Sequence, residues 1–273
     1  PELPEVETIV RGLQKQIVGK KIVGVKVILP RIIRGEAKDF ITLVSGTTIL
    51  KVWRRGKMIV IDLSTQRSIL IHLKLTGQVI HISADAPVVK HTHIIFELFD
   101  GYQLRYLDLR QFGYLCLTNT SMIQALTPSG AEPLEILEDE FKALMQSRKI
   151  RLKPFLLNQS FIAGIGNIYA DEILHKAGIH PLQRTHTISQ MQITKLYQAM
   201  KKVLRQAIEQ KGSSIRDYVD STGQKGNYQK YHQVYQRQGQ PCLTCHEKIV
   251  RVKIGGRSSH FCPRCQEMVC SEV

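Results

Sequence analysis

The first stretch of the chain has apolar side chains at a helical spacing. They recur every three or four positions: Val6, Ile9, Val10, Leu13 and Ile17. This spacing places them on one face of a helix and leaves the polar residues on the other face. Pro4 suits the first turn, where its missing N–H leaves no hydrogen bond unmade. The pattern predicts an amphipathic helix over residues 3–17.

Short β-branched runs follow, separated by Gly, Pro and Asp, from Lys21 to about Leu117. Many short strands without regularly spaced helices between them favour a sandwich or barrel-like sheet domain. Examples of the predicted strands are residues 22–29, 47–52, 58–63, 69–73, 94–99 and 102–107.

The second half of the chain returns to helical periodicity. A stretch containing Pro and Glu, residues 127–140, is the predicted connection between two domains. Residues 167–176 form a predicted helix, with Asn167 as its N-cap and Gly178 just past its end. Apolar positions recur again between residues 196 and 208 and predict a further helix with a buried face.

Basic residues outnumber acidic ones, 38 Lys and Arg against 23 Asp and Glu, which gives a net charge of +15. Such a surplus favours a polyanionic partner, nucleic acid first. An anionic membrane surface is the competing interpretation, but the sequence has neither a basic amphipathic anchor nor a lipidation signal. No segment reaches the roughly 18 apolar residues of a membrane span. The acidic opening lacks the features of a signal peptide, so we expect a protein of the reducing cytosol.

Four of the six cysteines form two Cys-x-x-Cys pairs, Cys242 with Cys245 and Cys262 with Cys265, separated by 16 residues. Four thiolates at this spacing close a tetrahedral zinc site with no open position, so the predicted zinc ion is structural. An iron–sulfur cluster and a redox dithiol remain as alternatives. The other two cysteines, Cys116 and Cys270, are expected to be ordinary thiols.

A β-hairpin is predicted between the two cysteine pairs. Residues 249–254 and 258–261 are its strands, and Gly255-Gly256-Arg257 is its turn, with Arg257 at the tip. An arginine at a hairpin tip is either a plain surface residue or, on a basic zinc hairpin, a nucleic-acid contact.

The sequence Gly164-Ile165-Gly166-Asn167 enters a predicted helix. Its glycines allow a tight turn, and the exposed amides of a helix N-terminus favour a phosphate oxygen. A capped turn between two helices without a ligand is the simpler interpretation, and the sequence leaves both open.

Pro1 offers a secondary amine if its nitrogen is the free N-terminus, as after removal of an initiator methionine. An α-amine has a pKa near ~8, which leaves a useful neutral fraction at neutral pH. A secondary amine that attacks an aldehydic or acetal carbon gives an iminium, which acts as an electron sink. Glu2 beside it can serve as general acid or base.

These features together resemble one family, the bacterial formamidopyrimidine-DNA glycosylases, within the superfamily shared with endonuclease VIII. The resemblance runs the whole length of the chain. Its motifs are the opening PELPEVET, RRGK at Arg54–Lys57, the run Asp108–Gly113, AGIGNIYADE at Ala163–Glu172 and the Gly-Gly-Arg hairpin between the cysteine pairs.

The resemblance implies a two-domain α+β fold. The N-terminal β-sandwich with flanking helices is the catalytic domain, residues 1–130, followed by a linker, residues 131–148. Residues 149–273 form a helical DNA-binding domain with a helix–two-turn–helix motif, which includes the zinc hairpin at 235–269. One structural Zn²⁺ is the implied cofactor, and duplex DNA lies across the cleft between the domains.

The implied activity is that of a bifunctional DNA glycosylase and AP lyase of base excision repair. The damaged nucleotide is flipped out of the duplex. Pro1 attacks C1′, Glu2 assists by proton transfer at the sugar, and an iminium drives β- and δ-elimination. With Lys57 these are the expected catalytic residues. Glu5 and Glu172 match acidic positions near the site, where a structural pairing with basic groups is an equal alternative.

The resemblance also implies a set of DNA contacts. Phosphates are bound by Lys57, Asn167, Tyr235 and other residues at matching positions, and three side chains fill the gap that the flipped nucleotide leaves. Leu75 takes a place that is commonly methionine in the family. The expected DNA-binding residues are His72, Leu75, His91, Arg110, Phe112, Lys153, Asn167, Tyr235 and Arg257.

A polar, Gly-containing stretch, residues 212–231, is a predicted mobile loop. By resemblance it covers the lesion, and its backbone amides read the oxidised purine. The expected lesion-reading residues are Ile215, Arg216, Asp217 and Tyr218.

The expected partner is double-stranded DNA with oxidised bases or abasic sites, bound by a monomer in the bacterial cytoplasm. Two alternatives remain. One is an endonuclease VIII-type enzyme, which favours oxidised pyrimidines. The other is a zinc-hairpin DNA-binding protein without catalytic activity, which explains the charge and the cysteines but gives Pro1, Glu2 and Lys57 no function.

Overall fold

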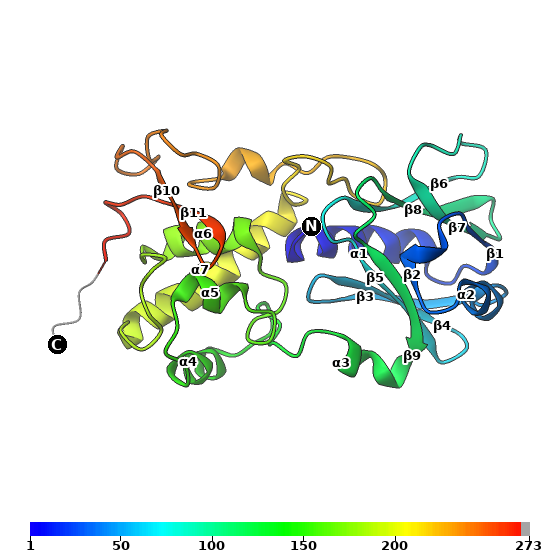
Figure 1. Cartoon of the computed structure of the whole chain (residues 1–273), viewed down its shortest axis with the longest axis horizontal. Coiled ribbons are helices and arrows are strands. Elements are labelled where there is room, and N and C mark those ends of the chain that lie inside the picture. Colours follow the sequence, from blue (N-terminus) through cyan, green and yellow to red (C-terminus); the bar gives the residue numbers. More distant parts are fainter. Residues whose placement is uncertain (269–273) are drawn as a thin grey trace. The chain divides into compact units, whose positions relative to one another are not determined.

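The computed structural model describes residues 1–268, and Cys270 lies outside them. The chain forms two compact units (Figure 1). The first contains Pro1, residues 3–127 and residues 210–229, and the second contains Glu2, residues 128–209 and the described part of 230–273.

Two sheets make up most of the first unit. A four-stranded antiparallel sheet has the order β1-β7-β8-β6, and a five-stranded sheet has the order β2-β9-β5-β4-β3. The strands are β1 (Ile22–Val27), β2 (Ile33–Arg34), β3 (Ile49–Arg55), β4 (Met58–Leu63), β5 (Arg67–His72), β6 (Gly77–Ser83), β7 (Thr92–Leu98), β8 (Tyr102–Asp108) and β9 (Tyr114–Asn119).

Helix α1 (Leu3–Ile17) completes the core of this unit. It packs against β3 and β4 of one sheet and β6 of the other. Its apolar face, with Val6, Leu13 and Ile17 fully buried, joins side chains from both sheets and from α2 (Ala37–Val44) in one cluster. The predicted helix over residues 3–17 is therefore confirmed, with the predicted face buried.

Strand β4 is buried on both faces over Met58–Ile61, which explains the unbroken apolar sequence of these four residues. Ile59 and Ile61 point into the main core, and Met58 and Val60 join a second cluster on the other face. Ile123, the first residue of α3 (Ile123–Leu126), covers that second cluster.

The second unit is mainly helical and contains the cysteine hairpin. Helix α6 contacts α5, α7 and β11, and α4 also packs on α7. Its elements are α4 (Glu138–Gln146), α5 (Leu152–Leu157), α6 (Asn167–Ala177), α7 (Gln190–Glu209), β10 (Val250–Ile254) and β11 (Arg257–Phe261). Short 3-10 turns lie at Pro30–Ile32, Thr120–Met122 and Tyr228–Tyr231.

Several details differ from the sequence predictions. The N-cap of α6 is Gly166, and Asn167 is its first helical residue, because the amides of the first turn bind a carboxylate instead of an Asn side chain. Gly178 does end the helix, with a φ of 67°. The predicted linker, residues 131–148, contains helix α4. No helix in the described part of the chain is both long and apolar enough to cross a membrane.

Candidate functional site

A cluster of positive charge surrounds His72 in the first unit. His72 ends β5 and is paired with Met58, which follows Lys57. Burial and then the charges of Lys74, Lys57, the N-terminus of Pro1 and Arg34 lower the pKa of His72 to about 3. The amine of Pro1 therefore belongs to a cationic cluster, and such a cluster attracts an anion.

The imidazole of His72 has a defined tautomer. Its Nδ1 accepts a hydrogen bond from the backbone N–H of Lys74 at 3.0 Å. Because the ring is neutral, its single proton is on Nε2, which can donate to an oxygen ligand. His72 also stacks on Tyr114, with ring centroids 5.6 Å apart.

Lys57 occupies the turn between β3 and β4. Arg55 pairs with Met58, so Gly56 and Lys57 are the two turn residues, and Gly56 has a φ of 56°. The buried guanidinium of Arg54 donates to the carbonyl of Gly56 at 3.0 Å and pairs with Glu7 of α1 at 2.9 Å. The RRGK motif thus fixes the turn that carries Lys57.

Asp108 holds together the two loops that carry the predicted gap-filling residues. Its buried carboxylate accepts hydrogen bonds from the hydroxyl of Thr76 and, at 2.8 Å, from the N–H of Gly113. The N–H of Arg110 donates to the same Thr76 hydroxyl at 2.9 Å. Asp108 belongs to one of the sequence motifs, but no role was predicted for it. Its position at the end of a strand, directly before a loop, could have indicated a role in fixing that loop.

The side chains on these loops are exposed. Leu75 is 56% exposed and Phe112 is 55% exposed. The guanidinium of Arg110 lies 4.8 Å from the ring centroid of Phe112. His91 belongs to the same neighbourhood, because its carbonyl accepts the N–H of Asp108 at 3.0 Å.

The predicted lesion loop is attached to the first unit at several points. Oε1 of the buried Glu5 accepts the N–H of Ser213 at 2.8 Å. The side chain of Tyr218 joins the main core, and the carbonyl of Asp217 accepts the amide of Gln78 at 2.6 Å. Farther along, the carbonyl of Ser221 accepts the N–H of His81 on β6 at 2.9 Å. Ile215 and Asp217 are half-buried and Arg216 is exposed.

In the second unit, the carboxylate of Glu2 caps α6. It accepts hydrogen bonds from the N–H of Gly166 at 2.7 Å and of Ile168 at 2.8 Å, with a longer one from Tyr169 at 3.4 Å. The Gly164–Asn167 turn therefore offers these amides to a carboxylate of the chain. Asn167 is half-buried, and its Oδ1 is a buried atom without a hydrogen-bond partner. A Cβ at Gly166 would lie 2.4 Å from Cδ of Glu2, so glycine is required for this approach.

Glu172 binds the backbone that leads to Tyr235. Its carboxylate accepts the N–H groups of Gln233, Val234 and Tyr235 at 2.9, 3.0 and 2.9 Å. Burial raises the pKa of Glu172 even though these amides favour its charged form. The ring of Tyr235 lies edge-on to the ring of His260, with centroids 5.3 Å apart.

Lys153 is fully buried, so it is not a solvated surface lysine. Its Nζ donates to Oδ1 of Asp171 at 2.6 Å and to the carbonyl of Ser258 at 2.7 Å. Oδ2 of Asp171 accepts the N–H of His260 at 2.9 Å. Burial lowers the pKa of Lys153, and Asp171 opposes that shift.

The four cysteines fit one zinc ion. Their Sγ atoms lie within 4.8 Å of one another, with Cys242 and Cys265 3.8 Å apart and Cys245 and Cys262 3.4 Å apart. Tetrahedral Zn–S bonds of about 2.3 Å place the sulfurs roughly 3.8 Å apart. All four are thiols that can ligate as thiolates, so the site can hold one structural zinc with no position left for substrate.

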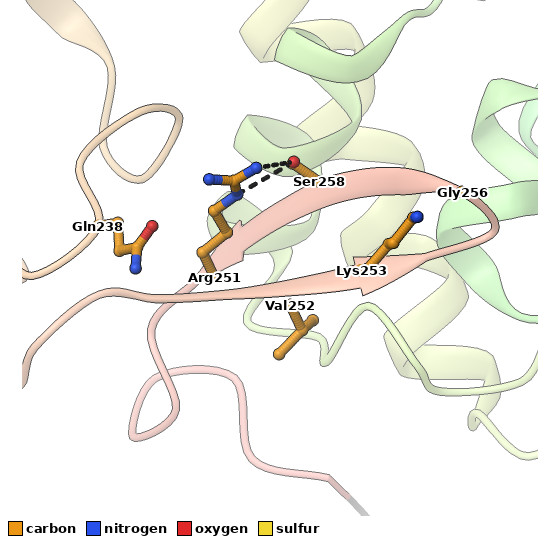
Figure 2. A pocket seen from close by; sticks show the side chains of 6 residues that line it. All are labelled: Gln238, Arg251, Val252, Lys253, Gly256 and Ser258. Atoms are coloured by element: carbon orange, nitrogen blue, oxygen red, sulfur yellow. Dashed lines mark hydrogen bonds between the residues drawn. The ribbon is translucent and has the colours of Figure 1, made fainter.

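The hairpin between the cysteine pairs has a two-residue Gly255-Gly256 turn, and Arg257 is the first residue of β11, paired with Ile254. Arg257 was predicted at the tip of the turn, and the structure places it one position beyond the tip. A polar pocket of about 440 Å³ lies on the hairpin, lined by Arg251, Lys253, Ser258 and their neighbours (Figure 2). Arg251 bridges the two strands by donating to Oγ of Ser258 from Nε and Nη2 at 3.0 and 2.7 Å.

Comparison with known proteins assigns these features to one family. Three family models match: the formamidopyrimidine-DNA glycosylase N-terminal domain over residues 1–115, the H2TH domain of the same enzymes over residues 130–219, and the zinc finger found in FPG and IleRS over residues 239–267. The chain belongs to the formamidopyrimidine-DNA glycosylase family.

Full-length relatives agree with this assignment. The formamidopyrimidine-DNA glycosylase of Pelotomaculum thermopropionicum is 45% identical over 274 residues, covering 98% of this chain and 99% of the relative. A crystal structure of Lactococcus lactis FPG mutant G226P with Fapy-dG containing DNA matches with a TM-score of 0.92, 36% identity and coverage of 98% and 100%. Wild-type Lactococcus lactis FPG with oxidised pyrimidine containing DNA matches with a TM-score of 0.90, 34% identity and the same coverage.

The family assignment confirms the predicted two-domain α+β fold and the cysteine site. The structure gathers Pro1, Lys57 and His72 in one cluster of the first unit. In the second unit, Lys153 binds the hairpin at the carbonyl of Ser258, the residue after Arg257. Asp171 and Thr76, which hold such elements in place, were not identified from the sequence.

Proposed function

We propose that this protein is a DNA glycosylase and AP lyase that removes oxidised purines, 8-oxoguanine and formamidopyrimidines, from duplex DNA. Enzymes of this family share both activities, and a relative of 36% identity is crystallised with Fapy-dG containing DNA. The observation that carries the proposal for this chain is the position of the Pro1 amine. Its positive charge lies near enough to His72 to help lower the pKa of that imidazole, as do the charges of Lys57 and Arg34.

Pro1 is the proposed nucleophile. The lone pair of its neutral secondary amine attacks C1′ of the flipped nucleotide, and the bond from C1′ to the base breaks, with a proton delivered to the leaving base. The Pro1 nitrogen then loses its proton, and the bond from C1′ to the ring oxygen O4′ breaks with a proton delivered to O4′, which gives an iminium between C1′ and the Pro1 nitrogen. Loss of a C2′ proton then expels the 3′ phosphate, and a second elimination expels the 5′ phosphate.

Glu2 is the proposed proton-transfer group at the sugar. Its carboxylate is held by the N–H groups of Gly166 and Ile168, so it keeps one orientation. A fixed acid or base beside the reacting atoms accelerates such steps by roughly 10²–10⁴-fold. Glu2 follows Pro1 directly in the chain, which keeps the two groups together.

The cationic cluster is the proposed grip on the DNA backbone next to the lesion. Lys57 supplies a positive charge, and the neutral His72 supplies an Nε2–H donor for a phosphate oxygen. Lys57 also lies in the catalytic cluster with Pro1. Asn167, Tyr235, Arg257 and Lys153 are the proposed contributions of the second unit, and His91 joins those of the first.

Leu75, Arg110 and Phe112 are the proposed residues that fill the gap left by the flipped nucleotide. Exposed apolar side chains on loops fixed by Asp108 can insert into a base stack. Ile215, Arg216, Asp217 and Tyr218 are the proposed readers of the lesion. We also propose that the protein acts as a monomer in a bacterial cytoplasm.

A cleavage assay with defined duplexes tests the function. Duplexes with 8-oxoguanine or a formamidopyrimidine opposite cytosine are expected to give a one-nucleoside gap with phosphate at both ends. An undamaged duplex is expected to stay intact. Failure to cut either lesion, with binding retained, would support a zinc-hairpin protein without catalysis.

An endonuclease VIII-type preference for oxidised pyrimidines is the second candidate. One observation favours testing it, because the Lactococcus lactis relative is crystallised with oxidised pyrimidine containing DNA. We expect purine lesions to be cut faster than an oxidised pyrimidine in a paired assay. The reverse order would favour the second candidate.

A further inference from the structure

Lys153 has its ammonium in the protein interior. The side chain is fully buried, as is its partner Asp171 at 1% exposed. A buried charge is tolerated only when it is paired and hydrogen-bonded. Two of its three N–H donors go to Asp171 and to the carbonyl of Ser258. The ammonium is therefore committed to protein acceptors.

The strand that Lys153 binds is also held from other directions. Oγ of Ser258 accepts two hydrogen bonds from Arg251 of the neighbouring strand (Figure 2). Two residues farther along, the N–H and Nδ1 of His260 contact Oδ2 of Asp171 at 2.9 and 3.1 Å. The carboxylate of Asp171 thus links Lys153 to β11. Lys153, which belongs to α5, also binds the carbonyl of Ser258 directly.

The side chain of Arg257, by contrast, is exposed and has no hydrogen bond or ion pair with any residue in the described range 1–268, although its backbone pairs with Ile254. It follows a Gly255-Gly256 turn, in which both glycines have positive φ, 56° and 78°. A two-glycine turn restrains its neighbours weakly. The next residue, Ser258, is where the backbone becomes fixed.

We propose that Lys153 is a positioning residue, which fixes the hairpin backbone at Ser258 and thereby aims Arg257 at a DNA phosphate. This rests on the proposed function, in which Arg257 contacts DNA, and it replaces a contact between Lys153 and the damaged base. Loss of the Lys153 hydrogen bond makes the start of β11 more mobile. Ordering Arg257 on DNA binding then costs more free energy, and the affinity falls.

A double substitution, K153M with D171N, tests this in the zinc-loaded full chain. It removes both buried charges together and keeps the side-chain volumes, which avoids an unpaired buried carboxylate. We expect about tenfold weaker binding, the scale of one lost buried hydrogen bond. The loss should be the same for a duplex with a tetrahydrofuran abasic analogue and for a duplex with 8-oxoguanine. A loss confined to the 8-oxoguanine duplex would overturn the proposal, because it would place Lys153 at the base.

The R257Q background supplies the decisive comparison. If Lys153 acts through Arg257, the K153M and D171N pair should cost less than about twofold in that background. An undiminished loss there, or an R257Q variant that binds as tightly as wild type, would also overturn it. K195M, which removes an exposed lysine from α7, is the matched control and should change affinity less than about twofold.

Hydrogen exchange gives a readout without DNA. The amides of residues 254–258 should exchange faster in the double variant, while those next to the four cysteines keep their wild-type rates. K153R, which keeps a buried donor, should recover affinity to within about threefold. A K153R protein as weak as the double variant, with wild-type hairpin exchange, would contradict a positioning role. A wild-type protein inactive on every lesion would instead remove the proposed function itself.

Discussion

The N–H of Gly166 donates a hydrogen bond to Oε2 of Glu2 at 2.7 Å, across 164 residues of sequence. The same carboxylate accepts the N–H of Ile168. These amides can only donate, and a carboxylate can only accept, so the match is complete. The first turn of α6 therefore binds an acidic group that belongs to the chain and directly follows the proposed nucleophile in the sequence.

Replacing Glu2 by Gln should reduce base excision much more than DNA affinity. The side-chain amide of Gln directs an NH₂ donor at the N–H donors of the helix. It also cannot act as a general acid or base. We expect the single-turnover rate of excision to fall by at least about 10²-fold. Gel-shift titration with an undamaged duplex should give an affinity within about threefold of wild type. An E2Q enzyme with near wild-type excision would exclude Glu2 as the proton-transfer group.

Replacing Gly166 by Ala should displace the same carboxylate. A Cβ there would lie 2.4 Å from Cδ of Glu2, so we expect a loss of stability of about 1–3 kcal/mol together with slower excision. The combined E2A and G166A variant removes the obstructing side chain. Thermal unfolding should then show partial recovery of stability compared with G166A alone, and no recovery would place the clash elsewhere.

The low pKa of His72, about 3, makes stability depend on pH. The unfolded state protonates this histidine below about pH 6.5, while the folded state stays neutral until about pH 3. Protons therefore favour unfolding, and stability falls as pH decreases through that window. His232, whose pKa burial lowers to about 4, acts in the same direction.

Denaturant unfolding at pH 7.5 and at pH 5 tests this expectation. H72Q should lose less stability than wild type between the two pH values. H186Q, at an exposed position, is the control and should behave as wild type. An H72Q protein with the wild-type pH dependence would show that the pKa of His72 is the same in the folded and unfolded states.

Removal of zinc should weaken DNA binding and leave the first unit folded. Chelation frees four thiolates that hold the hairpin, so Arg257 loses its support. We expect affinity to fall at least about tenfold, with recovery on adding zinc. Cobalt substitution should give the spectrum of a tetrahedral four-thiolate site, which C262S abolishes and C116S preserves. Tight binding by zinc-free protein would exclude a role for the hairpin.

Leu75 should act by filling space, because it is exposed and no polar group is involved. L75A is expected to slow excision of 8-oxoguanine opposite cytosine by roughly tenfold, with unchanged thermal stability. L75M should retain activity, since methionine fills a similar volume. The control L50A removes a leucine that is 58% exposed on β3 and should have no effect. Equal rates for L75A and wild type would remove Leu75 from the gap-filling set.

Hydrophobic periodicity and motif spacing predicted the helix over residues 3–17 and the cysteine site. The 3–17 helix was predicted because its buried face comes from one continuous segment. The cysteine site was predicted because two short motifs supply every ligand. Strand β6 and helix α2 were not predicted. Strand β6 has only Gly77 and Val79 buried, and α2 buries only Phe40 and Val44 in eight residues.

Side-chain partners that are distant in sequence could not be predicted. Lys153 reads as a surface or ligand-binding lysine until Asp171 and Ser258, 18 and 105 residues away, are placed around it. A pairing of Glu172 with basic groups was one expectation, yet its carboxylate accepts hydrogen bonds from three backbone amides. No side-chain pattern marks a backbone amide as a partner, so such contacts need the fold.

Pro1 is the nucleophile of the proposed reaction, and its nitrogen forms the covalent bond to the DNA. Borohydride reduction during the reaction with a duplex bearing 8-oxoguanine opposite cytosine should convert the iminium into a stable protein–DNA crosslink. Peptide mapping is predicted to place that crosslink on the nitrogen of Pro1. A crosslink on Lys57 or another lysine, or strand cleavage without any crosslink, would contradict the account.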